Sequence, residues 1–126
     1  MNIRFVTKTI HAYLDYPVAI ALLGLPFLLN LGASHPWALW LSVAAGAAAF
    51  VLTIFTDHIL GVFRLLPYTF HVRVDFLVGA LFIIAPFIFG FSGLDAWYYW
   101  INGAAVITVV SLQKPEELSA EGPSLT

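Results

Sequence analysis

Four long apolar runs limit this chain to folds that a lipid bilayer can surround. The runs cover about residues 13–32, 37–56, 74–92 and 96–112. Each is close to the ~20 apolar residues that a helix needs to cross a bilayer. Together they hold only two charged residues, Asp15 and Asp75. Only 10% of the whole chain is charged, against about a quarter in a soluble domain. We therefore expect an all-α membrane protein with four transmembrane helices.

The connections between the runs divide the chain. Residues 32–36 and 92–96 are short and contain turn formers such as Gly32, Pro36 and Gly93, so each is expected to close a helical hairpin. The predicted organisation is a first hairpin over 1–56, a cytoplasmic or interfacial connection over 57–72, a second hairpin over 73–112 and a flexible tail over 113–126.

The two hairpins are copies of one another. A shift of sixty residues aligns rare residue types without a gap, which an apolar composition alone would not produce. The aligned pairs include His11/His71, Asp15/Asp75, Pro26/Pro86, Trp37/Trp97 and Trp40/Trp100. Because each copy holds an even number of spans, the repeats are expected to be parallel, with matching residues on the same side of the membrane.

The basic residues predict the orientation. All five flank the N-terminus, the middle connection or the C-terminus, and neither hairpin loop has one. They are Arg4, Lys8, Arg64, Arg73 and Lys114. The positive-inside rule then places both termini in the cytoplasm. Residues 1–34 resemble a secretory signal, but their repeat partner lies in mid-chain, so we expect the first run to be retained as a helix.

Charge and cysteine content exclude several classes of function. The net charge is -2, so the chain lacks the basic surface of a nucleic-acid-binding protein. It contains no cysteine, which excludes disulfides, thiolate metal ligands and a cysteine nucleophile. The expected surroundings are the lipid bilayer, with other membrane subunits or further copies of this chain as partners.

Five ionisable residues are the candidate functional site. In each His-x-x-x-Asp motif the two side chains share one helix face, and both motifs are expected at the cytoplasmic edge. The predicted cluster comprises His11, Asp15, Asp57, His71 and Asp75. As a structural element, it would join the two hairpins through polar contacts between membrane helices.

Three other uses of this cluster stay open. Two histidines with two or three carboxylates suit Zn²⁺, Mn²⁺ or non-haem iron. Haem held by His11 and His71 is a weaker variant of the same idea. Proton or small-solute transport is the third, because ionisable residues within membranes often serve transport, although no polar path to the far side is visible in the sequence.

Two further groups of residues are expected to shape the bundle. Pro26 and Pro86 lie in mid-run and should kink their helices. Small residues of the second and fourth runs would let helices approach closely or offer a docking face to another chain. They are Ala44, Ala45, Gly46, Ala48, Gly103, Ala104 and Ala105.

These motifs resemble those of the SPW-repeat family of small bacterial integral membrane proteins. That family's pattern is H-x-x-x-D, an apolar stretch to S-P-W, a tryptophan opening the next helix, and a T-D-x-x-x-G element before an Arg-x-hydrophobic-Pro turn. The corresponding elements here are His11…Asp15, Leu25-Pro26-Phe27, Trp37, Thr56-Asp57 to Gly61, Arg64 to Pro67, His71…Asp75, Ala85-Pro86-Phe87 and Trp97. Neither copy keeps the serine or tryptophan of S-P-W. The resemblance implies a two-repeat bundle in the bacterial inner membrane and implies no activity.

From these observations we expect a non-enzymatic membrane protein that acts as an accessory or scaffold subunit of a complex or homo-oligomer, without a cofactor. A transition-metal protein is the alternative, and a transporter is the third hypothesis.

Overall fold

The computed structural model describes residues 3–58 and 60–115 of the chain. Within these ranges it forms four α-helices. They are α1 (Lys8–Leu28), α2 (Trp37–Phe55), α3 (Tyr68–Phe89) and α4 (Gly93–Ser111). The predicted all-α fold class is confirmed.

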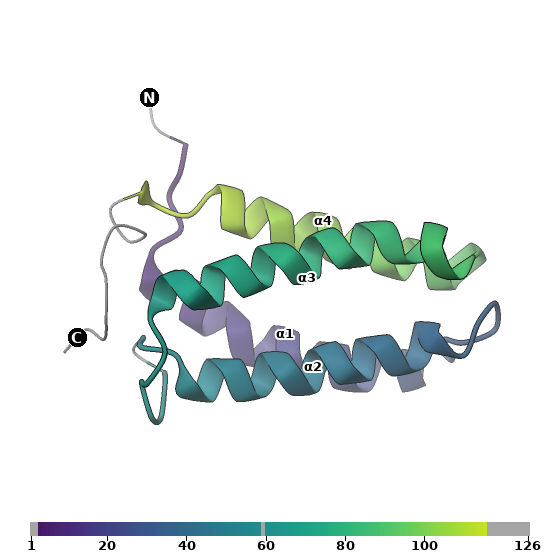
Figure 1. Ribbon diagram of the computed structural model, residues 1–126, viewed down its shortest axis with the longest axis horizontal. Helices are drawn as coiled ribbons and strands as arrows, with labels where there is room; N and C mark the ends of the chain where they lie inside the picture. The colour runs from purple at the N-terminus through teal and green to yellow at the C-terminus, as the bar shows by residue number, and fades with distance from the viewer. Residues whose placement is uncertain (1–2, 59, 116–126) are drawn as a thin grey trace.

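The helices paired into hairpins lie side by side (Figure 1). The α1–α2 and α3–α4 loops lie at the same end of the molecule. The N-terminal segment, the connection from α2 to α3 and the end of α4 lie at the opposite end. Corresponding parts of the two hairpins therefore lie at the same end of the bundle.

Both hairpins begin earlier than the apolar runs. The first helix starts at Lys8 rather than about 13, and the third at Tyr68 rather than about 74. Thr7 caps α1 because its hydroxyl accepts a hydrogen bond from the backbone N–H of Ile10 at 3.1 Å. The helices thus continue past the apolar residues, so that both His-x-x-x-Asp motifs are helical.

Three of the helices, α1, α2 and α3, are long and apolar enough to cross a membrane. Helix α4 does not reach that level, because its first half holds Asp95, Asn102 and two tyrosines among its apolar residues. The chain is compatible with a multi-pass membrane protein, and the fourth span predicted over 96–112 stays a prediction.

Each hairpin packs tightly through glycine. A Cβ atom on Gly46 would lie 2.9 Å from both Cγ and the backbone N of Leu23 in α1. A Cβ atom on Gly103 would lie 2.8 Å from the carbonyl oxygen of Gly79 in α3. The backbones of paired helices therefore meet at points where no side chain fits, a packing mode common in membrane bundles.

The two predicted kink prolines lie inside α1 and α3, and both are buried. The carbonyl of Pro26 accepts the N–H of Leu31 at 2.9 Å, and that of Pro86 accepts the N–H of Phe91 at 3.0 Å. The two helices therefore end in the same turn, sixty residues apart. The kinks themselves stay predictions.

At the hairpin-loop end, α4 binds the first hairpin through hydroxyl groups. The Tyr99 hydroxyl donates to the carbonyl of Ala38 at 2.8 Å, and the Tyr98 and Ser42 hydroxyls lie 2.6 Å apart. The Ser42 hydroxyl also donates to the carbonyl of Leu22. All of these contacts are buried, so they fix how the two hairpins meet at this end.

Asp95, in the first turn of α4, adds a charged contact at the same end of the bundle. Its carboxylate accepts hydrogen bonds from the backbone N–H groups of Gly32 and Ser34, each at 2.9 Å, and from the Ser34 hydroxyl. Burial opposes ionisation, but these hydrogen bonds outweigh it and hold the pKa of Asp95 below its usual range. Asp95 is therefore a carboxylate at neutral pH and ties the first loop to the second hairpin.

The segment before α1 and the segment after α4 meet at the opposite end of the bundle. Val6 N–H donates to the carbonyl of Leu112 at 2.9 Å, and Lys114 N–H donates to Val6 at 2.8 Å. Gln113, which the sequence placed in the flexible tail, is fully buried. Most of that predicted tail, residues 116–126, lies outside the described residues.

Candidate functional site

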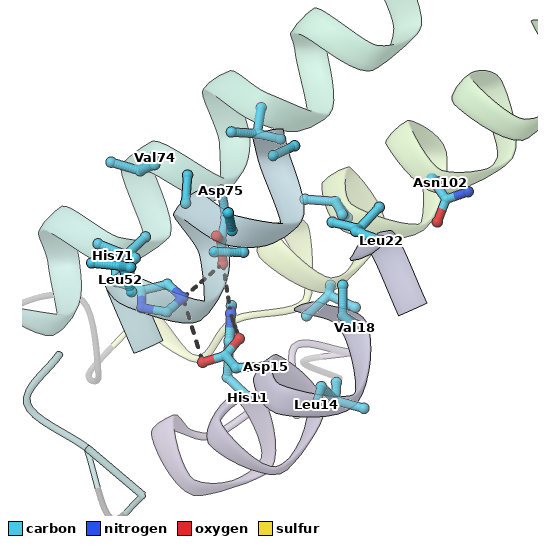
Figure 2. A pocket seen from close by; sticks show the side chains of 18 of the residues that line it. His11, Leu14, Asp15, Val18, Leu22, Leu52, His71, Val74, Asp75 and Asn102 are labelled. Atoms are coloured by element: carbon cyan, nitrogen blue, oxygen red, sulfur yellow. Dashed lines mark hydrogen bonds and ion pairs between the residues drawn. The ribbon is translucent and has the colours of Figure 1, made fainter. Parts of the chain in front are cut away.

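The two His-x-x-x-Asp motifs converge on one point between α1 and α3 (Figure 2). His11 Nε2 lies 3.1 Å from Asp15 Oδ1 and 2.8 Å from Asp75 Oδ2. His71 Nε2 lies 3.2 Å from Asp75 Oδ2 and 3.4 Å from Asp15 Oδ2. Each histidine thus contacts the carboxylate of its own motif and that of the other copy. We call these four residues the His–Asp cluster.

The His–Asp cluster is largely shielded from solvent. The exposed fractions of the side chains are 4% for His11, 9% for Asp15, 2% for His71 and 20% for Asp75. Buried charges in such surroundings need compensating charges or hydrogen bonds. The protonation and hydrogen bonding of each group therefore decide whether protons or a metal ion balance the two carboxylates.

Asp57, the fifth predicted member, is not brought into the His–Asp cluster. Its Oδ2 lies 3.6 Å from Lys8 Nζ. Within the described part of the chain neither carboxylate oxygen has a hydrogen-bond partner. The neighbouring His58 reaches the cluster instead, with Nε2 3.2 Å from Asp15 Oδ2. At the end of α2, which closes at Phe55, the chain turns so that Asp57 faces Lys8.

The orientation of His11 is set by Gln113. The amide of Gln113 donates through Nε2 to the carbonyl of Val6 at 2.9 Å, so its Oε1 is an acceptor. Oε1 accepts the hydroxyl of Tyr68 and lies 3.2 Å from His11 Nδ1. His11 Nδ1 must therefore carry a proton, and its Nε2 is the nitrogen that faces the carboxylates.

The orientation of His71 is set in the same way by Thr56. The Thr56 hydroxyl donates its one proton to the carbonyl of Leu52 at 2.6 Å. Its oxygen lies 2.7 Å from His71 Nδ1 and must accept there. His71 Nδ1 therefore also carries a proton and directs Nε2 toward Asp15 and Asp75.

These two assignments require positive charge between the two Nε2 atoms and the carboxylates. A neutral histidine with a proton on Nδ1 has a lone pair on Nε2, which would repel a carboxylate oxygen about 3 Å away. Attraction needs either an additional proton on each Nε2 or a metal ion between the Nε2 atoms and the carboxylates. One ligand atom from each of the four residues can be chosen so that all lie within 4.8 Å of one another.

Several contributors were missed by the sequence reasoning. Thr56 and His58 lie in the T-D-x-x-x-G element, and their polar side chains in that motif were a signal for them. Tyr68 and Gln113 had no such signal, because Gln113 meets His11 across 102 residues of sequence. Neither residue has a counterpart of the same type sixty positions away, so the comparison of the two repeats did not identify them.

A large cavity, open on one side to the surface of the bundle, adjoins the cluster. Its volume is about 820 Å³, and residues of all four helices line it. The His–Asp cluster forms its polar end (Figure 2). Among the small residues predicted to pack or dock, Ala45, Ala48 and Ala105 line this cavity.

Comparison of the chain with protein-family models, with curated proteins and with solved structures gives no match in any of the three. The resemblance to the SPW-repeat family therefore stays a prediction that depends on the motifs quoted above.

Proposed function

We propose that this chain is an integral membrane protein that binds one divalent transition-metal ion at His11, Asp15, His71 and Asp75. The observation that carries the proposal is the orientation of the two histidines. Both Nδ1 atoms are engaged by fixed acceptors, and both Nε2 atoms face the same two carboxylates. Four spans with both termini in the cytoplasm, as the basic residues indicate, would put this site at the cytoplasmic edge.

The chemistry of the four ligands suits such an ion. Imidazole and carboxylate bind Zn²⁺ at roughly 2.0–2.2 Å in tetrahedral geometry, which separates neighbouring ligand atoms by roughly 3.4 Å. The histidine Nε2 atoms lie 2.8 and 3.2 Å from Asp75 Oδ2, and 3.1 and 3.4 Å from Oδ1 and Oδ2 of Asp15 respectively. A small outward movement of His11 and Asp75 would admit the ion. Two carboxylates would balance its charge, which favours binding in a buried site.

The surrounding residues support the same function. Metal-binding histidines usually donate the other ring N–H to a fixed acceptor, which sets the tautomer and the ring orientation. Gln113 and Thr56 have that role here for His11 and His71. His58 Nε2 lies within hydrogen-bond distance of Asp15 and would hold that carboxylate in place.

The scaffold hypothesis uses the same residues with two protons in place of the metal. Two imidazolium groups would then pair with two carboxylates and join the hairpins. Haem binding and transport also stay predictions.

Elemental analysis of the protein purified in mild detergent separates these hypotheses. We expect about one equivalent of a transition metal in the wild type, and its loss in the His11→Ala/His71→Ala double variant, because two of four ligands are gone. His35→Ala is the matched control, since His35 lies in the α1–α2 loop, where its ring contacts Phe89 and Phe91. A folded wild type that holds no metal after supply of Zn²⁺, Mn²⁺ and Fe²⁺ would overturn the metal proposal and favour the scaffold hypothesis.

A second prediction concerns the residue that orients His71. Replacing Thr56 by valine preserves the side-chain shape but removes the acceptor for the His71 Nδ1 proton. We expect the affinity for the metal to fall by roughly 10–100-fold, as for other residues that orient metal ligands. Competition titration with a chelator of known affinity measures this change.

Thr53→Val is a close control for Thr56→Val. Thr53 is buried in the last turn of α2, which Thr56 follows directly, and its hydroxyl also donates to the carbonyl four residues earlier, at 2.8 Å. Among the described residues, its hydroxyl makes no hydrogen bond with the His–Asp cluster. Equal losses in the two variants would show that the effect comes from the helix and not from the orientation of His71.

A further inference from the structure

The cavity between the hairpins has a charged end, formed by the His–Asp cluster, and a remainder that is apolar except for Asn102. It reaches from the His–Asp cluster to Leu22 in α1 and Asn102 in α4. Its volume of about 820 Å³ falls within the roughly 300–1,000 Å³ of cavities that hold small ligands. Away from the cluster its walls are mainly alanine, valine, leucine and phenylalanine. The shape and chemistry are those of a site for an amphiphilic molecule.

The cavity exists because the hairpins are joined at both ends and have small side chains between. The His–Asp cluster joins them at one end, and the tyrosine hydroxyls with Asp95 join them at the other. Between these contacts Ala45, Ala48 and Ala105 face the space. Larger side chains at these positions would fill it.

Asp75 presents an acceptor at the polar end. It is the most exposed member of the cluster, at 20%, and it lines the cavity. Among the described residues its contacts all go to Oδ2, so Oδ1 is available for a hydrogen bond. A ligand that enters the cavity must therefore satisfy this oxygen with a donor or leave it without a partner.

The charge of the cluster also limits the charge that the head group of a ligand can carry. Two carboxylates are balanced either by two protons on the histidines or by one divalent ion, and the cluster is neutral in both cases. An anionic or cationic head would bring an unbalanced charge into an apolar cavity at high cost. A neutral head that donates a hydrogen bond carries no such penalty.

We propose that this cavity binds a neutral amphiphile whose hydroxyl head donates a hydrogen bond to Asp75 and whose apolar chain lies in the space between the hairpins. The inference goes beyond metal binding and holds with the metal-bound or the doubly protonated cluster. It assigns to this chain a site for a hydroxyl-headed molecule of the membrane.

Binding of a labelled long-chain alcohol tests the proposal. Purified protein in lipid nanodiscs is titrated with tritiated 1-tetradecanol, followed by scintillation proximity, against empty nanodiscs as background. We expect one saturable site per chain. Unlabelled tetradecanol should displace the label, whereas tetradecane and the tetradecanoate anion should compete at least about tenfold less well, because neither donates a hydrogen bond to Asp75.

Two alanines of α4 provide matched variants. Ala105 lines the cavity and neighbouring Ala104 does not, and both are exposed on the helix surface. Ala105→Leu should weaken tetradecanol binding by about tenfold or more, because the added carbons occupy the ligand's space. Ala104→Leu should change the affinity less than about twofold. Metal content and thermal unfolding of both variants verify that the cluster and the fold remain intact.

Three results would overturn the inference. Equal competition by tetradecane would show that the cavity takes any lipid chain without recognising the head. Stronger binding of tetradecanoate than of tetradecanol would show that the site is cationic. An unchanged affinity in a folded Ala105→Leu variant would place the bound alcohol elsewhere. Repeating the titration on metal-free protein separates this inference from the proposed function, because alcohol binding is expected with and without the ion.

Discussion

Replacing Asp15 by alanine is expected to lower the free energy of unfolding by about 3–5 kcal/mol, the cost of breaking a buried ion pair by removing one partner. Asp15 is the residue on which three histidines converge. Its oxygens lie 3.1 Å from His11, 3.2 Å from His58 and 3.4 Å from His71. These histidines come from α1, from the connection after α2 and from α3, so the loss would loosen three segments at once. Titration of the purified protein with a denaturing detergent, followed by far-ultraviolet circular dichroism, measures the change.

Asp75→Ala provides the comparison for Asp15→Ala. Asp75 contacts two histidines rather than three, and its side chain is more exposed, at 20% against 9%. We therefore expect Asp75→Ala to lower the free energy of unfolding by less than Asp15→Ala does. The same difference between the two variants is expected in chelator-treated protein. If Asp15→Ala changed the free energy by less than about 1 kcal/mol, the carboxylate would not hold the histidines, and the central role given to Asp15 would be wrong.

Replacing Gly61 by alanine is expected to have the second large effect. A Cβ atom at this position would lie 1.9 Å from the carbonyl oxygen of Thr56, which no pair of atoms can tolerate, and 3.3 Å from Cγ of Arg64. The turn must then open, and it carries Thr56 and His58 toward the cluster. We expect a loss of about 3 kcal/mol of stability and a weaker affinity for the metal in the same variant.

Gly24→Ala separates this local clash from the general effect of adding a methyl group. A Cβ atom on Gly24 meets no atom within 4 Å, and Gly24 lies inside α1. Alanine there should be neutral or stabilise the helix by up to about 1 kcal/mol. If Gly61→Ala folded with wild-type stability and metal affinity, the turn would be free to adopt another backbone conformation, and its role in orienting Thr56 would not hold.

The helices and the pairing of the motifs were predictable, because both depend on short-range regularities. A helix brings residues four apart onto one face, so His11 had to share a face with Asp15, and His71 with Asp75. The ends of the helices were less predictable. Capping by Thr7 extends α1 beyond the apolar residues, and a window that counts apolar residues does not detect a cap.

The place of Asp57 shows where prediction from the sequence stops. Its position at the cytoplasmic end of the second run suggested a fifth member of the cluster, but the turn after α2 directs His58 to Asp15 and Asp57 to Lys8. Whether Asp57 or the neighbouring His58 faces the cluster depends on backbone dihedral angles in a short connection. Those dihedrals follow from contacts such as Asp57 N–H with the carbonyl of Leu66 at 2.9 Å, and no periodic pattern encodes them.

Two features can be derived from the order of residues alone: the class of the protein, an all-α chain of apolar helices, and two His-x-x-x-Asp motifs in matching places. Hydrophobicity and helical periodicity are properties of neighbouring residues, so they can be read along the chain. In contrast, it is the packing of the two hairpins that lets Gln113 and Thr56 fix the two histidine tautomers and that leaves a cavity beside them, lined by alanines. Hydrogen bonds and packing depend on distances of a few tenths of an ångström between residues far apart in sequence, and those distances exist only once the hairpins have met.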